Sequence, residues 1–128
     1  MTNRILEEVA RHEHLPIDLE ALQARCLGNL DLVDRVLAKF TTQVDADLDD
    51  LERAIKAGNA EQAAHLAHRI KGIAGSVEAR DLYADAALAE EVALEKRLAD
   101  LPDFLKRMRG DRTEVTSCIK CVSRQSNN

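Results

Sequence analysis

The sequence predicts an all-α fold, an antiparallel up-down-up-down four-helix bundle with one or two short extra N-terminal helices. Hydrophobic residues make up 45% of the chain and aromatic residues only 2%, so the core must be aliphatic, which favours helices. Apolar residues recur every three or four positions, without the alternation that is typical of strands. The long amphipathic segments are joined by short connections, which makes successive helices antiparallel neighbours.

A chain of 128 residues suits one domain. We expect a single domain over 1–128 with its core at about 17–123, an N-terminal extension over 1–14 and a frayed tail over 124–128. A short helix is predicted over 2–12.

Asp18 is a candidate N-cap for a helix over about 18–26, and Gly28 and Asn29 end this helix and begin the next. The clearest helix covers 30–57. Its inward positions step by three or four residues and are Val33, Leu37, Phe40, Val44, Leu48, Leu51 and Ile55. Its opposite face is predicted to be solvated and carries Asp34, Asp45, Asp49, Glu52 and Lys56.

Gly58 predicts a left-handed helix end, and Asn59 with Gln62 predicts a capping box for a helix over 60–77. Asp81 is expected to cap a helix over about 82–99, with Pro102 as a break after it. The inward set of that helix is predicted to be Leu82, Ala86, Ala89 and Ala93, widened by Leu88 and Val92. A last helix is expected to be broken or bent near Gly110.

Composition argues against several functions. The net charge is −5, with no basic stripe and almost no aromatic residues to stack on bases, so no nucleic-acid partner is expected. No apolar run is long enough to cross a bilayer, and the N-terminus lacks a signal-peptide pattern, so we expect a cytoplasmic protein without membrane insertion. Cys118 and Cys121 form a C-x-x-C pair, but the sequence has no second cysteine pair to complete a zinc site. We therefore interpret them as reduced thiols.

His68 lies off the apolar stripe of the helix over 60–77, which comprises Ala63, Leu66, Ile70, Ile73 and Val77. It is about 200° around the axis from both Leu66 and Ile70, so it is predicted to point at water. Its neighbours on the helical wheel are Ala64, Lys71, Gly72 and Gly75. Small residues leave room for a bulky partner at the imidazole, and Lys71 adds a positive charge. An exposed histidine beside two helix-kinking glycines is the simpler alternative.

The segment AHRIKGIAGSVEA, residues 67–79, resembles the phosphoacceptor motif of histidine phosphotransfer (HPt) domains. That motif reads A-H-x-[LIV]-K-G and is matched by Ala67, His68, Ile70, Lys71 and Gly72. The segment departs at Glu78, where the family usually has glycine, so the local turn geometry is open. Residues 17–40 also look like the N-terminal helices of the family, and the resemblance covers about 17–100.

The resemblance implies a phosphorelay intermediate in which Nε2 of His68 is phosphorylated and Lys71 supports the phosphate. It implies receiver domains of response regulators and a hybrid sensor histidine kinase as partners. It further implies a phosphocarrier without its own ATP site, which binds no cofactor and meets Mg²⁺ at the receiver. The residues expected at the docking face are Ala64, His65, Arg69, Gly72 and Gly75.

Three questions stay open from the sequence. His65 lies on the flank of the same face and competes for the acceptor role, although it lacks the K-G sequence that follows His68. A non-catalytic adaptor or dimerisation module makes no demand on His68, and a metal-binding bundle could use Glu61, His65 and His68. The oligomeric state is not readable, and a monomer is favoured.

Overall fold

The computed structural model describes the backbone of residues 17–126 and the side chains of residues 17–117. The helix expected over 2–12 and the side chains of Cys118 and Cys121 therefore lie outside the described part. The elements in chain order are α2 (Leu19–Arg25), α3 (Leu30–Lys56), α4 (Ala60–Ser76), α5 (Arg80–Leu94), the 3₁₀ turn η1 (Leu98–Asp100) and α6 (Leu101–Ser126).

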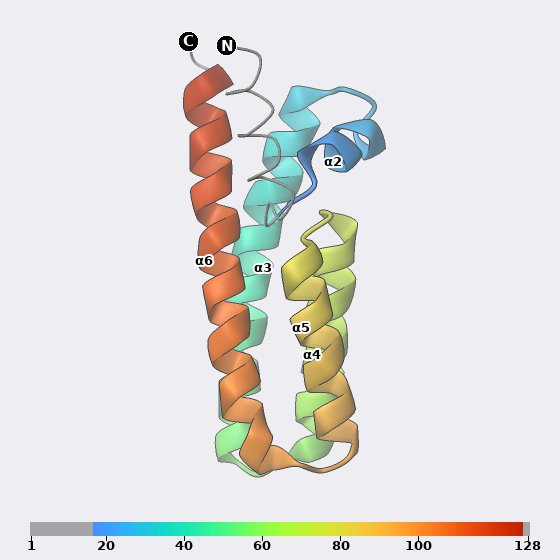
Figure 1. The fold of residues 1–128 in the computed structure, drawn as a ribbon, viewed down its shortest axis with the longest axis vertical. Coiled ribbons are helices and arrows are strands. Elements are labelled where there is room, and N and C mark those ends of the chain that lie inside the picture. The colour runs from blue at the N-terminus through green and yellow to red at the C-terminus, as the bar shows by residue number, and fades with distance from the viewer. Residues whose placement is uncertain (1–16, 127–128) are drawn as a thin grey trace, which may run out of the picture.

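Four long helices form the predicted antiparallel bundle (Figure 1). α3 and α6 run the length of the molecule, and the shorter α4 and α5 form a hairpin beside them. The short helix α2 lies over the turn between α4 and α5 because the backbone N–H of Asp18 donates to the carbonyl of Glu78 at 3.0 Å. No helix in residues 17–126 is both long and apolar enough to cross a membrane.

The core is aliphatic, as the composition requires. Its largest fully buried side chains are Ile17, Leu22, Val44, Leu48, Leu51, Leu66, Ile70, Val77, Leu82, Leu101, Met108 and Val115. Alanine dominates the contact between α4 and α5, where Ala63, Ala67, Ala74, Ala86, Ala89 and Ala93 are buried. These small side chains let the two helix axes approach closely, which brings the polar residues at the edges of the interface within reach of one another.

Helices α2, α3, α4 and α5 all end in the same hydrogen-bonded motif. In each, the residue after the C-cap has positive φ, and the next N–H bonds to a carbonyl five residues back. Gly58 fills the positive-φ position after α3, as predicted, but Leu27, Glu78 and Lys96 fill the other three, with φ of 55°, 60° and 60°. Glu78 therefore adopts a conformation that suits glycine, which preserves the turn where the sequence departs from the HPt pattern.

Helix starts follow the predicted caps with one exception. The side chains of Asp18, Asn29 and Asn59 accept hydrogen bonds from N–H groups three residues on. α5, however, begins at Arg80, so the prediction of Asp81 as N-cap was wrong. Asp81 lies in the first turn, where a carboxylate is favoured by the positive end of the helix dipole.

The predicted ends of α5 and α6 also need correction. α5 stops at Leu94, not at 99, because Lys96 turns the backbone left-handed and η1 follows. Leu88 is 44% exposed and does not widen the buried stripe, whereas Val92 does.

The expected break near Gly110 is absent from the helix over Leu101–Ser126, since Met108 and Val115 are buried on either side of it. Pro102 sits in the first turn of α6, where its missing N–H costs nothing, and α6 extends into the tail that was expected to fray.

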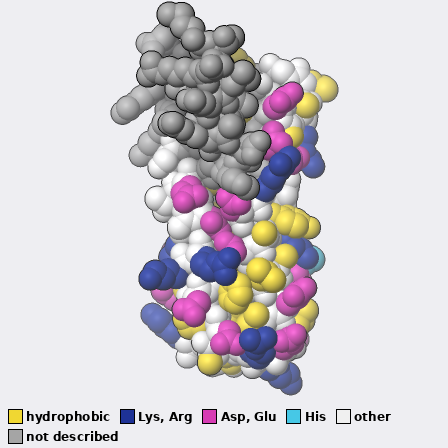
Figure 2. Space-filling view, viewed as in Figure 1, with side chains coloured by type: hydrophobic (Ala, Val, Ile, Leu, Met, Phe, Trp, Pro, Cys, Tyr) yellow, Lys and Arg dark blue, Asp and Glu magenta, His cyan; other side chains and the backbone are white. Residues whose placement is uncertain are grey.

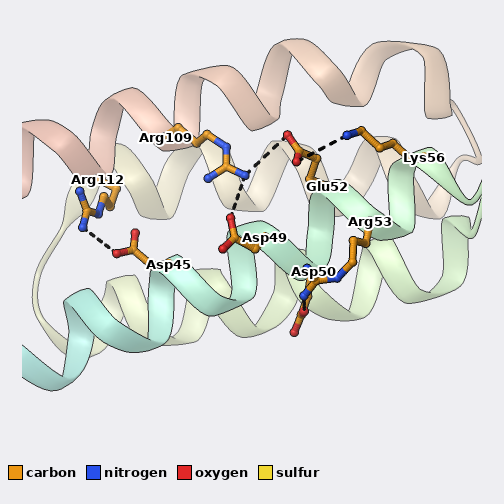
Figure 3. Close-up of polar contacts among 8 residues, drawn as sticks. All are labelled: Asp45, Asp49, Asp50, Glu52, Arg53, Lys56, Arg109 and Arg112. Atoms are coloured by element: carbon orange, nitrogen blue, oxygen red, sulfur yellow. Dashed lines mark hydrogen bonds and ion pairs between the residues drawn. The ribbon is translucent and has the colours of Figure 1, made fainter.

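The acidic face of α3 is not purely solvated, as the sequence had suggested, but forms ion pairs with α6 (Figure 3). Asp45 Oδ2 lies 2.6 Å from Arg112 Nη2, and Arg109 Nη2 lies 3.2 Å from Asp49 Oδ1. Glu52 Oε1 lies 3.7 Å from Arg109 Nη2, and its Oε2 lies 3.7 Å from Nζ of Lys56 on α3 itself. Such exposed pairs contribute at most about 1 kcal/mol each, so they orient α6 against α3 more than they stabilise the bundle.

Candidate functional site

His68 points away from the core, as its position on the helical wheel predicts. Leu66 and Ile70, on either side of it in sequence, are buried, whereas the His68 side chain is 63% exposed. His68 is exposed between two buried residues because α4 packs the stripe of Ala63, Leu66 and Ile70 into the bundle. The imidazole is thus held on a rigid helix and remains accessible to a macromolecule.

Glu90 of α5 connects the two polar residues of the site. Its Oε2 lies 2.9 Å from Nδ1 of His68, and its Oε1 lies 2.8 Å from Nζ of Lys71. His68 and Lys71 are one turn apart on α4, so one carboxylate can bridge them from the neighbouring helix. Both contacts are possible because the alanine-rich interface brings α4 and α5 together.

The charge on Glu90 determines the tautomer of His68. The hydrogen bond from Lys71, above all, lowers the pKa of Glu90 below its ordinary value, and that bond also raises the pKa of Lys71. Glu90 is therefore an ionised carboxylate at neutral pH and can only accept hydrogen bonds. Nδ1 of His68 must then carry the proton, which leaves the lone pair of a neutral imidazole on Nε2.

A surface hollow of about 520 Å³ adjoins the imidazole. It runs between the C-terminal end of α5 and the first half of α4, and its lining is Ala60, Glu61, Ala64, His65, His68, Glu90, Ala93, Leu94 and Lys96. Leu94 is 67% exposed there, one of the exposed large apolar side chains of α5, with Tyr83 and Leu88. Figure 2 shows apolar side chains on the lower part of the face where α5 and α6 lie, with charged side chains around them.

The two predicted access glycines differ in their surroundings. A Cβ at Gly72 would meet nothing within 4 Å, so the surface there is open. A Cβ at Gly75 would lie 3.5 Å from the ring of Tyr83, so the space over Gly75 is already filled from α5. Gly72 thus leaves room for a partner, while Gly75 leaves room for Tyr83.

The other predicted docking residues lie on two sides of His68. Ala64 and His65 line the hollow, so His65 shares the site with His68. Arg69 turns toward α3, where its Nη2 is 3.3 Å from Oδ1 of the buried Asp47. Burial raises the pKa of Asp47, and Arg69 opposes that rise.

The metal-binding alternative finds no geometric support. Among the described residues, no three His, Cys, Asp or Glu side chains lie close enough together to hold a metal ion. Glu61, His65 and His68 all line the hollow but do not converge.

Sequence analysis missed Glu90. A signal existed, since α4 and α5 form a hairpin with its turn near Glu78, and His68 and Glu90 stand at similar distances before and after it. Residues at such positions face each other across an antiparallel helix pair. This pattern places the partner of His68 in the middle of α5, and the register of the packed helices selects Glu90 there.

The fold and site define a class of protein, namely a helical bundle that presents an exposed histidine on one helix with a carboxylate from the next helix behind it. The Hpt domain family model matches residues 35–119, and the chain belongs to this family. Its function is histidine phosphotransfer in phosphorelay signalling.

A solved structure has a similar fold. Histidine-containing phosphotransfer protein B (HptB) from Pseudomonas aeruginosa PAO1 superposes with a TM-score of 0.81 at 23% identity, over 88% of this chain and 98% of that one. No curated protein sequence matches the chain significantly.

Proposed function

We propose that His68 is the phosphoryl acceptor of this domain and that Nε2 is the reacting atom. The observation that carries this proposal is the bond from Nδ1 of the exposed His68 to the ionised Glu90. It orients the ring and leaves the lone pair on Nε2. His65 lines the same hollow, but no such bond to it is found among the described residues.

The donor we propose is an aspartyl phosphate on a receiver domain. Nε2 attacks the phosphorus, an N–P bond forms, and the P–O bond to the receiver aspartate breaks with its electron pair leaving on that carboxylate. The imidazole ring becomes positively charged because Nδ1 keeps its proton. Glu90 lies against that charge and stabilises it. The reverse sequence returns the phosphoryl group to a receiver.

Lys71 has two roles in this proposal. In the free protein it holds Glu90 through a 2.8 Å bond and keeps the carboxylate ionised. Once His68 carries a phosphoryl group of about −2 charge, the flexible ammonium group can turn toward the phosphate oxygens. The side chain is partly exposed, so this rotation meets little obstruction.

We further propose that the chain works as a phosphocarrier without an ATP site. The Mg²⁺ that assists the transfer would be held by the receiver, where it neutralises charge on the moving group. Receiver domains of response regulators and of a hybrid sensor histidine kinase are the proposed partners. They would dock over the hollow and the open surface at Gly72, with Ala64, His65 and Leu94 at the contact. A cytoplasmic location and a monomeric state remain part of this proposal.

The test is phosphoryl transfer from a phosphorylated receiver domain, with Mg²⁺, to the wild type and to the His65→Gln and His68→Gln variants. We expect acid-labile, base-stable label on the wild type and on His65→Gln, and none on His68→Gln. Label lost only from His65→Gln would assign the acceptor role to His65. Label on none of the three proteins across a broad panel of receivers would favour the adaptor function.

A further inference from the structure

A second cluster of ionisable side chains lies between α5 and α6, apart from the residues that line the hollow at His68. It surrounds a surface hollow of about 470 Å³. Its charged lining consists of four carboxylates and one guanidinium: Asp81, Asp85, Arg107, Asp111 and Glu114. Nothing in the proposed phosphotransfer uses these residues.

The single cation of this cluster pairs with only one of the carboxylates. Arg107 Nη2 lies 3.0 Å from Asp85 Oδ1, and Asp85 is only 8% exposed. Asp111 lines the same hollow as Asp85. The Oδ2 atom of Asp111 is buried and has no hydrogen-bond partner in the described part of the chain. Asp85 therefore has a counter-ion, and Asp111 has none among the residues that the structure describes.

Within the described part of the chain, no second cation forms an ion pair with Asp111. From α5 it faces Asp81 and Asp85, and from its own helix Arg107 and Glu114 share its hollow. The neighbouring arginines of α6 are engaged with α3, since Arg112 pairs with Asp45, and Arg109 pairs with Asp49 and Glu52. Two carboxylates that line the same hollow with only one cation disfavour each other's ionisation.

We propose that Asp111 is protonated in the folded protein at neutral pH and donates a hydrogen bond to Asp85, so that one shared proton joins α6 to α5. Loss of this proton places two like charges at the interface and weakens the packing of α6. The bundle thus contains a pH-sensitive contact that is independent of His68.

The pKa of Asp111 agrees with this proposal. Burial, followed by the hydrogen bond and the charge of Asp85, raises the pKa of Asp111 to about 8. An acid whose pKa is higher in the folded than in the unfolded chain binds its proton preferentially in the folded state. Its contribution to stability therefore declines as the pH rises from about 4 toward 8, and it is constant above that range.

The direct test is carbon NMR of the full chain with ¹³C-labelled aspartate carboxyl groups, assigned with the Asp85→Asn and Asp111→Asn variants. We expect one carboxyl resonance of this pair to titrate above pH 7 in the wild type. Titration of both groups below pH 5 would overturn the proposal. The variants serve only to identify the two resonances, and the titration itself is measured on the wild type.

The consequence for stability is tested by urea unfolding of the wild type and Asp111→Asn between pH 5 and pH 9. The folding equilibrium constant of the wild type, relative to that of Asp111→Asn, should fall by up to about tenfold per pH unit between pH 5 and 7. Asp103→Asn, which removes an exposed carboxylate from the same helix, should keep the pH dependence of the wild type. A ratio of wild type to Asp111→Asn that does not change with pH would contradict the shared proton.

Discussion

Glu90 Oε2 lies 2.9 Å from Nδ1 of His68, and the two residues come from neighbouring helices, α5 and α4. The same carboxylate accepts a bond from Lys71. This bridge supplies what an exposed histidine on a helix lacks by itself, namely a defined ring orientation and a defined tautomer.

Replacing Glu90 with Gln should slow phosphoryl transfer to His68 by between about tenfold and a hundredfold. A hydrogen bond to a charged partner contributes about 1.5–3 kcal/mol, and an amide cannot balance the positive charge on the phosphorylated ring. The measurement is the single-turnover transfer rate at saturating receiver. Glu91→Gln, a change at the adjacent exposed position of α5, is the matched control and should transfer at the wild-type rate. Equal rates for both variants would mean that Glu90 does not act on the ring.

The Lys71–Glu90 pair should stabilise the protein within a defined pH window. The pKa of Glu90 is lowered in the folded state, so its contribution is present above the ordinary value of 4.5 and is lost as the pH falls through the folded value. The pKa of Lys71 is raised, so its contribution is present below 10.5 and is lost as the pH rises through the folded value. Urea unfolding of Lys71→Met should show less loss of stability in acid than the wild type. Lys106→Met, at an exposed position of α6, should behave like the wild type, and an equal acid loss in Lys71→Met would contradict the assignment.

Gly72→Ala should raise the free energy of unfolding by about 1 kcal/mol, because a methyl group there meets nothing within 4 Å and alanine favours the helix. Gly75→Ala should raise it by a similar or smaller amount, since its methyl group would contact the Tyr83 ring at 3.5 Å. Chemical unfolding measures both values.

A bulky side chain at Gly72 should separate the effect on stability from the effect on partner access. Gly72→Leu should slow transfer from the receiver while the protein stays folded, because the added side chain projects into open surface beside His68. Unchanged transfer in Gly72→Leu would show that the receiver does not approach over this position.

Lys96→Gly should stabilise the fold by about 1 kcal/mol, because Lys96 is held at φ 60°, which is unfavourable for a residue with a Cβ. Glu78→Gly relieves the same strain but removes the ion pair in which Glu78 Oε1 is 2.6 Å from Arg25 Nε. Its net gain should be smaller, by at most about 1 kcal/mol. The difference between the two variants in urea unfolding measures that ion pair. A larger gain from Glu78→Gly would mean that the pair destabilises the fold.

The sequence determined the helices and the orientation of His68, because both depend on a period of 3.6 residues that the apolar positions reveal directly. The stripe that buries Leu66 and Ile70 places His68 outward in any bundle that covers the stripe. The caps at Asp18, Asn29 and Asn59 were predictable for the same local reason, since a cap bonds to a backbone group three residues away.

Only the tertiary structure decided which residues meet across helices. Glu90 reaches His68, Tyr83 covers Gly75, and Asp111 lines the same hollow as Asp85 because of the register between packed helices, which periodicity along one helix does not specify. The unbroken course of α6 through Gly110 has the same origin, since burial of Met108 and Val115 outweighs the roughly 1 kcal/mol cost of one glycine. Local periodicity thus determined which face each helix presents, and packing energy determined the partners that each face finds.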